Sequence, residues 1–139
     1  MQTITSFTID HNVLTEGFYL SRVDKNVFTY DLRFKKPNHG DYLHIAAMHT
    51  IEHLFATVVR NSKYKDKVVY FGPMGCRTGF YLLLFDVQKD EAQQLVKECI
   101  EECLKLDYIP GSKKIECGNY RSHNLAGAKA ELKSYLEKL

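Results

Sequence analysis

The five residues His49-Thr-Ile-Glu-His53 have the types and the spacing of a metal site. They fall within residues 42–59, a run without Gly or Pro whose apolar residues recur at helical spacing, so we expect a helix there. At about 100° per residue, His49 and His53 lie one turn apart on the same face of that helix. Two imidazoles so placed can hold one divalent metal ion, and Glu52 beside them can move protons. Such a site usually has a third protein ligand and an open position, so another segment must supply the third donor.

Two of the four cysteines have the pattern of packing residues. Cys99 and Cys103 are one helical turn apart and form an apolar stripe with Leu95 and Leu106. Free cysteine behaves as a small buried hydrophobe. We therefore predict that Cys99 and Cys103 belong to the core.

The other two cysteines have the pattern of functional thiols. Cys76 lies in a Gly-rich turn, where a packing cysteine is unusual, and the neighbouring cation Arg77 would favour its thiolate form. Cys117 precedes Gly118 in a loop, and a loop thiolate is a good soft ligand for zinc or iron(II). His123 could be a further ligand or merely a loop residue. Cys76 is therefore interpreted as a reactive group and Cys117 as a candidate ligand.

Strands and helices must hold these residues in place. Residues 27–34 alternate, which puts Tyr30 and Leu32 on one face of a strand, with Asp31 and Arg33 on the other. On that polar face Arg33 could clamp an anionic group or simply be solvated. The pattern predicts strands near 18–23, 27–34, 68–71 and 80–87, helices near 41–60, 90–106 (with Asp90 as N-cap) and 125–139, and short extended segments at 3–11 and 115–118.

This order of elements predicts an α+β fold. We expect an antiparallel sheet of about four strands with helices packed on one face, forming a single domain over residues 1–139. The segment 80–87 is apolar almost throughout and is expected to be a central strand.

The composition narrows the possible partners and location. The formal net charge of +2 is too small to make nucleic acid or an anionic membrane the main partner. No apolar run reaches the roughly 18 residues that a membrane span needs. The first residues do not have the basic end and apolar stretch of a signal peptide. We therefore expect a cytoplasmic protein with reduced cysteines.

Two interpretations of the H-x-x-E-H motif at His49–His53 depend on few other residues of the chain. In a small inverted-zinc peptidase Glu52 would activate water, and a distant Glu116 or Glu131 would be the third ligand. In a non-catalytic metal-binding module, Cys76 would be structural and His123 could close the fourth position.

A third interpretation uses nearly the whole chain, which resembles the S-ribosylhomocysteine lyase (LuxS) family. Each matching segment is a weak signal, but five in this order and at this separation are highly specific. The matching segments are Ser6-Phe-Thr-Ile-Asp-His11, Asp31-Leu-Arg-Phe-Lys-Lys-Pro-Asn38, His49-Thr-Ile-Glu-His53, Pro73-Met-Gly-Cys-Arg-Thr-Gly-Phe-Tyr81, and Cys117-Gly118 with His123-Asn-Leu125.

The resemblance implies a role for each matching residue. The metal ligands would be His49, His53 and Cys117. The acid–base pair would be Glu52 and Cys76. The residues that line the substrate pocket, partly across a homodimer interface, would be Ser6, His11 and Arg33. The implied cofactor is one divalent metal per subunit, iron(II) in the cell and zinc or cobalt as purified.

The implied reaction is redox-neutral. The ribose carbonyl of S-ribosylhomocysteine migrates along the sugar, and β-elimination then releases homocysteine and 4,5-dihydroxy-2,3-pentanedione, a quorum-signal precursor. Successive protons come from different carbons, so two bases are useful. Three positions differ from the Lys, acidic residue and Gln of many members: Thr29, Tyr70 and Arg77. Because every expected ligand and base is present, we interpret the chain as a divergent, active branch.

Overall fold

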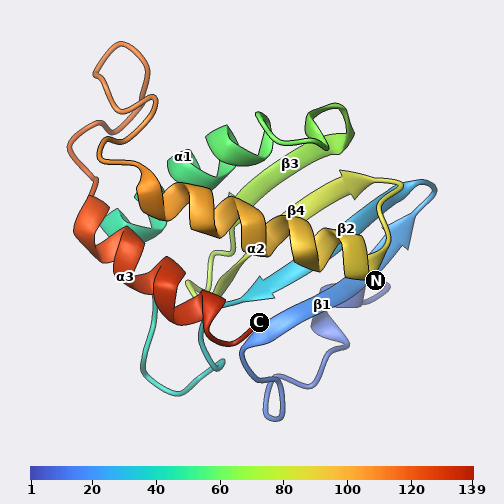
Figure 1. The fold of residues 1–139 in the computed structure, drawn as a ribbon. Coiled ribbons are helices and arrows are strands. Elements are labelled where there is room, and N and C mark those ends of the chain that lie inside the picture. The colour runs from blue at the N-terminus through green and yellow to red at the C-terminus, as the bar shows by residue number, and fades with distance from the viewer.

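Four antiparallel strands and three α-helices make up the fold of this computed structural model, which describes residues 1–139 (Figure 1). The strands are β1 (Gly17–Asp24), β2 (Val27–Arg33), β3 (Val68–Pro73) and β4 (Gly79–Phe85), and the helices are α1 (Ile45–Val59), α2 (Lys89–Lys105) and α3 (Leu125–Leu136). The strand order in the sheet is β1-β2-β4-β3, which confirms the α+β prediction and the central place of β4.

Two hairpins, joined through the middle of the sheet, give this order. Strands β1 and β2 form one hairpin, and β3 and β4 form the other. Between them β2 pairs with β4 from Val27↔Phe85 to Arg33↔Gly79. This long-range pairing brings the end of β2 beside the loop that joins β3 to β4.

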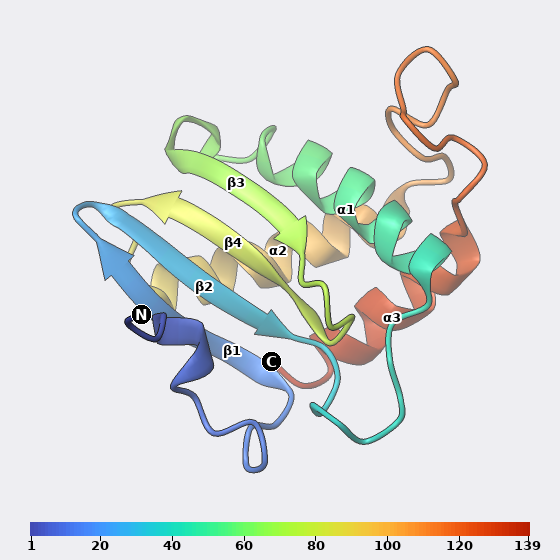
Figure 2. The same ribbon diagram turned by 180° about the vertical axis from the view of Figure 1, so that it is seen from behind.

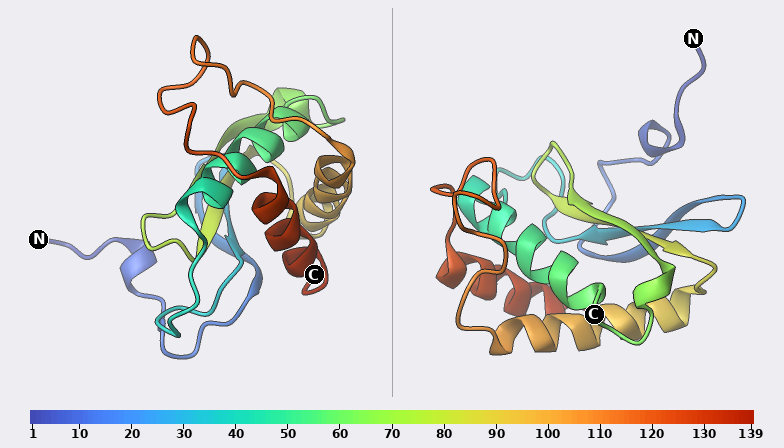
Figure 3. Two further views of the ribbon diagram at one scale, coloured as in Figure 1. Left: turned by 90° about the vertical axis from the view of Figure 1, so that its left-hand side faces the viewer. Right: turned by 90° about the horizontal axis from the view of Figure 1, so that it is seen from above.

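All three helices cover one face of the sheet, as expected (Figures 1 and 3). One cluster of 23 buried residues lies between the helices and the sheet. In it, Tyr135 of α3 stacks on Phe34 with 4.1 Å between ring centroids, and its hydroxyl donates to the Gly17 carbonyl over 2.8 Å. Cys99 and Cys103 of α2 are 2% and 0% exposed, which confirms their packing role.

The opposite face of the sheet is covered only in part. The N-terminal segment lies on this side, next to β1 (Figures 2 and 3). Residues that alternate with the core residues of β4, such as Leu83 between Leu82 and Leu84, point to this face. Leu83 pairs with Tyr70 of β3, and Tyr70 and Phe85 are about half exposed. None of the helices is long and apolar enough to cross a membrane.

Helix α1 begins at Ile45, four residues later than the expected start at 41. The preceding residue, His44, is extended, with φ −66° and ψ 138°. Leu43 is fully buried, and its N–H donates to the Arg77 carbonyl over 2.8 Å. This tertiary contact holds the chain extended where the local pattern favoured helix.

Three smaller predictions of local structure were wrong. The segment 3–11 forms no strand but contains a short 3-10 helix, Thr5–Phe7. The segment 115–118 is not extended, because the N–H groups of Glu116 and Cys117 both donate to the Lys113 carbonyl and form a turn. The N-cap of α2 is Gln88, and Asp90 lies in the first turn instead, where a carboxylate also favours the helix.

Candidate metal centre and a separate cysteine site

Helix α1 presents His49 and His53 away from the core. The helix is anchored by Thr50, Ile51 and Leu54, which are fully buried against the rest of the protein. The two histidines are half-buried outside the core cluster, with ring centroids 4.7 Å apart. The helical spacing therefore does bring the two imidazoles together.

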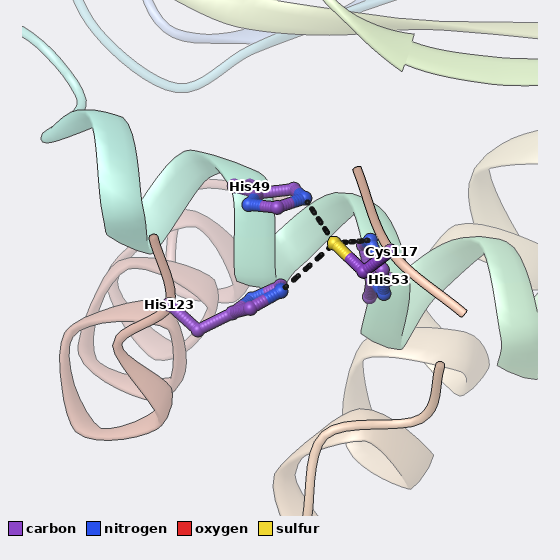
Figure 4. A group of neighbouring side chains, drawn as sticks. All are labelled: His49, His53, Cys117 and His123. Carbon is purple, nitrogen blue, oxygen red and sulfur yellow. Dashed lines mark hydrogen bonds between the residues drawn. The ribbon is translucent and has the colours of Figure 1, made fainter. Parts of the chain in front are cut away.

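The segment between α2 and α3 supplies two more donors (Figure 4). The Cys117 sulfur lies 3.5 Å from Nε2 of His49, 4.0 Å from Nε2 of His53 and 3.7 Å from Nε2 of His123. One donor atom from each of the four residues lies within 4.8 Å of all the others. The structure thus brings the predicted His49, His53 and Cys117 together and adds His123 to the group.

The other ring nitrogens of His49 and His53 are held by backbone carbonyls. His49 Nδ1 donates to the Ser122 carbonyl over 2.7 Å, and His53 Nδ1 donates to the Pro110 carbonyl over 2.8 Å. Because a carbonyl oxygen can only accept, the proton of each neutral ring is on Nδ1 and the lone pair is on Nε2, towards Cys117. This is the tautomer that binds a metal ion.

His123 is held differently. Its Nδ1 lies 2.9 Å from the Thr50 hydroxyl, which can donate or accept, so its tautomer is not fixed in the same way. Its ring stacks on His49 with 4.0 Å between centroids. Burial, together with the neighbouring His49 and His53, lowers the pKa of His123, which favours the neutral ring.

The donor set fits a divalent metal ion. Imidazole nitrogens and a thiolate suit zinc or iron(II), and two of the rings are already oriented for binding. Glu52 lies on α1 between the two histidines, half-buried and without a hydrogen bond or an ion pair. The two glutamates that the peptidase alternative offered as third ligand have other partners. Glu131 pairs with Lys35 over 3.0 Å, and Glu116 accepts from the Lys113 N–H.

Cys76 lies in a second site, on the exposed loop between β3 and β4. A cavity of about 370 Å³ opens beside it. The cavity is lined by His11, Pro37, Asn38, Tyr42, Gly75, Cys76, Arg77 and Thr78. The structure thus brings Cys76 and His11 together, whereas Ser6 is half-buried nearby in the chain and does not line the cavity.

Arg33 is neither solvated nor open to the cavity. Its side chain is 2% exposed, and it donates to both carboxylate oxygens of Asp31, over 3.1 and 2.6 Å. Burial raises the pKa of the Asp31 carboxyl, and the hydrogen bonds from Arg33 oppose that shift. Arg33 also donates to the Thr78 hydroxyl over 2.8 Å. Contact between Arg33 and a substrate stays a prediction.

The guanidinium of Arg77 makes its contacts with residues other than Cys76. It lies over the Tyr42 ring, 5.7 Å from the centroid, and donates to the Leu43 carbonyl over 3.4 Å. The residue that does contact the thiol is Thr78, whose hydroxyl lies 3.0 Å from the sulfur. Thr78 was missed because a threonine after a Gly-rich turn gives no chemical signal in the sequence.

The two groups are separate within one chain. The metal-type group consists of His49, His53, Cys117 and His123. No hydrogen bond links Cys76 or Thr78 to this group, and none of its four residues lines the Cys76 cavity. The fold and these groups define a small α+β protein with a His/Cys metal-type centre and a separate accessible thiol.

Comparison with known proteins assigns the chain to a family. The family model described as S-ribosylhomocysteinase (LuxS) matches residues 4–139, and the chain belongs to this family. It is 49% identical to an S-ribosylhomocysteine lyase of Borreliella burgdorferi, over 99% of this chain and 92% of the relative. Proteins with the same name from Desulfotalea psychrophila (97% of this chain, 89% of the relative) and Phocaeicola vulgatus (100% and 91%) are 47% and 44% identical. The family match does not favour the peptidase alternative.

Proposed function

We propose that this protein is an S-ribosylhomocysteine lyase that cleaves the thioether of its substrate to homocysteine and 4,5-dihydroxy-2,3-pentanedione. The observation that carries the proposal is the pairing, in a member of this family, of a preoriented His/Cys donor group with a separate accessible thiol. The relatives that match over nearly the whole chain bear the name of this activity. A peptidase would need no second thiol.

We assign the metal to His49, His53 and Cys117, one ion per subunit. The carbonyl partners of the two histidines support this assignment, because they leave both Nε2 lone pairs free. A divalent metal held there would supply Lewis acidity, which stabilises negative charge as it develops on a substrate oxygen. Iron(II) is the proposed metal in the cell, with zinc or cobalt in purified protein, since all three accept imidazole and thiolate ligands.

Cys76 and Glu52 are the proposed acid–base pair. Cys76 takes up and returns the protons of the two carbonyl migrations, and Glu52 serves the later proton transfer and the elimination that releases the thiol. The accessible sulfur of Cys76 and the unpaired carboxylate of Glu52 support these roles. Each proton abstraction leaves an electron pair on the substrate, as an enediolate in the carbonyl migrations. In the elimination the C–S bond breaks and its electron pair leaves with the homocysteine sulfur, so no external oxidant or reductant is needed.

A homodimer would bring the two groups together. Each chain by itself holds the metal-type group apart from the cavity of Cys76 and His11. The partly covered face of the sheet carries exposed Tyr70 and Phe85, and exposed apolar surface is typical of interfaces. We propose that the Cys76 side of one copy faces the metal-type group of a second copy, so that the active sites lie at the interface. Ser6, His11 and Arg33 would then border the substrate.

The proposed activity also implies the kind of substrate, the cellular location and the use of the products. The substrate is a small molecule, the expected location is the cytoplasm, and the product is a quorum-signal precursor. The released homocysteine re-enters methionine synthesis.

The closed metal-binding module remains the second candidate, because His123 lies 3.7 Å from the Cys117 sulfur and could occupy a fourth position. A turnover assay separates the two candidates. Purified protein with one metal ion per chain, incubated with S-ribosylhomocysteine, should release homocysteine that a thiol reagent detects.

The variant Cys76→Ala should abolish this release and keep the metal, because Cys76 lies outside the donor group. Cys99→Ala, which changes a buried cysteine of α2, is the matched control and should keep both turnover and metal. A metal-loaded protein that releases no homocysteine would contradict the proposed function.

A further inference from the structure

A buried hydroxyl links Cys76 to the ion pair beneath it. Thr78 is 2% exposed. Its Oγ1 lies 2.8 Å from a terminal guanidinium nitrogen of Arg33 and 3.0 Å from the Cys76 sulfur. Thr78 is therefore the only residue in direct hydrogen-bond contact with both groups.

The chemistry of the partners sets the direction of these hydrogen bonds. A guanidinium can only donate, so the Thr78 oxygen is the acceptor from Arg33. The hydroxyl keeps its own proton, and a Cys76 thiolate, which has no proton to give, can only accept it. A thiolate accepts such a proton more strongly than a thiol does, because hydrogen bonds to a charged group are the stronger ones.

The fold holds this hydroxyl in place. The Thr78 carbonyl accepts from the N–H groups of Phe34 and Lys35, both over 2.9 Å, which fixes the loop to the end of β2. Asp31 grips the guanidinium of Arg33 from the other side with two hydrogen bonds. The Thr78 hydroxyl is therefore already held beside the sulfur, and little side-chain entropy is lost when the hydrogen bond forms.

We propose that Thr78 is a positioning residue for Cys76: held by Arg33, its hydroxyl donates to the sulfur and favours the thiolate that acts as base. When Cys76 takes a proton, a C–H bond of the substrate breaks, an S–H bond forms, and the electron pair stays on the substrate. Thr78 itself transfers no proton. The role in turnover rests on the proposed function, but the effect on the thiol does not.

Other titratable or charged groups also face this loop and are kept constant in the test. They are His11 from the N-terminal segment, Asp31 and Arg33 from β2, Tyr42 before α1, Arg77 in the loop, and Tyr81 from β4.

The test measures alkylation of Cys76 by iodoacetamide across pH, with the modified peptide quantified by mass spectrometry in metal-loaded protein. Thr78→Val keeps the shape of the side chain and removes the hydroxyl. Its alkylation rate at neutral pH should fall about tenfold, the effect of one hydrogen bond to a charged group, and its pH profile should move upward. Thr78→Ser restores the hydroxyl and should restore the rate.

The control is Thr57→Val, which removes a threonine hydroxyl on α1 and should leave the alkylation profile unchanged. If folded Thr78→Val has the wild-type profile, the proposal is overturned. If Thr78→Val does not fold, Thr78→Ala provides the same comparison without a branched side chain.

Turnover is read separately. If the proposed function holds, Thr78→Val should lower kcat with little change in KM, because the buried hydroxyl is engaged by Arg33 and Cys76. If the wild-type protein releases no homocysteine but Thr78→Val still shifts the alkylation profile, the lyase activity is refuted and the role of Thr78 stands.

Discussion

His49 and His53 are oriented for a metal ion by backbone carbonyls that lie far from them in the sequence. The Ser122 and Pro110 carbonyls fix both tautomers with Nε2 towards Cys117. Such partners commonly change metal affinity by about 10–100-fold. The group is thus a preformed site, and Cys117 is its one thiolate donor.

Replacing Cys117 should therefore empty the site. In Cys117→Ala the metal loses its thiolate ligand, and we expect the metal content after dialysis to fall at least about tenfold. Metal analysis of the dialysed protein measures this. Cys103→Ala, a buried cysteine outside the group, should retain the full content. Retention of one metal ion per chain by Cys117→Ala would show that the third ligand is a different residue.

His123 distinguishes an open site from a closed one. In His123→Ala three donors remain, so we expect the protein to keep one metal ion per chain. Because His123 borders the site, the visible absorption of the cobalt-substituted protein should change. Loss of the metal from His123→Ala would instead support the closed, non-catalytic module.

At the scale of elements, the pairing of β2 with β4 builds the Cys76 site. The register places Arg33 opposite Gly79, so the buried cation lies directly beneath the loop that carries the thiol. Gly79 is required there by close approach: a Cβ at this position would lie 2.3 Å from the Leu32 carbonyl oxygen. The strand contact and the chemical site are therefore one structural unit.

The substitution Gly79→Ala should disturb this unit. The added methyl must push β4 away from β2, which we expect to cost about 1–3 kcal/mol of unfolding free energy. Urea unfolding measures the loss. Gly118→Ala is the control, because a Cβ there meets no atom within 4 Å. Alkylation of Cys76 should also slow in Gly79→Ala, and an unchanged rate would argue against the link between strand pairing and the thiol.

At the scale of the whole molecule, one chain carries two incomplete halves of the proposed active site. The metal-type group and Glu52 lie on α1 and the segment before α3, whereas Cys76 and His11 lie by the β3–β4 loop. A two-fold dimer can join the halves twice, once in each site, because its interface is self-complementary.

Mixing two inactive variants tests this arrangement. In a heterodimer of Cys76→Ala and His49→Ala, one site receives the intact metal group of the first chain and the intact Cys76 of the second. With free exchange of subunits at equal amounts, homocysteine release should recover to about a quarter of wild type, since half of the dimers are mixed and each has one intact site. If the halves act within one chain, every site is defective and no activity should return.

Local patterns in the sequence were sufficient for the main helices and strands and for which of their residues share a face. Side-chain periodicity determines which residues share a face of a helix or a strand, so α1, the two histidines, the core cysteines of α2 and the central β4 were all predictable. The start of α1 was not, because the contact of Leu43 with Arg77 overrides local preference.

The tertiary structure alone decided which groups meet. His123 joins the metal-type group through Thr50, 73 residues away in the sequence, and Arg33 reaches Cys76 through Thr78, 45 residues away. Adjacent Arg77 had been the expected partner of the thiol, but the backbone turns it towards Tyr42. Sequence order fixes neighbours along the chain, whereas burial and strand register decide which charges and donors face one another. That is why the proximity of His49 and His53 could be predicted from the sequence and the surroundings of Cys76 could not.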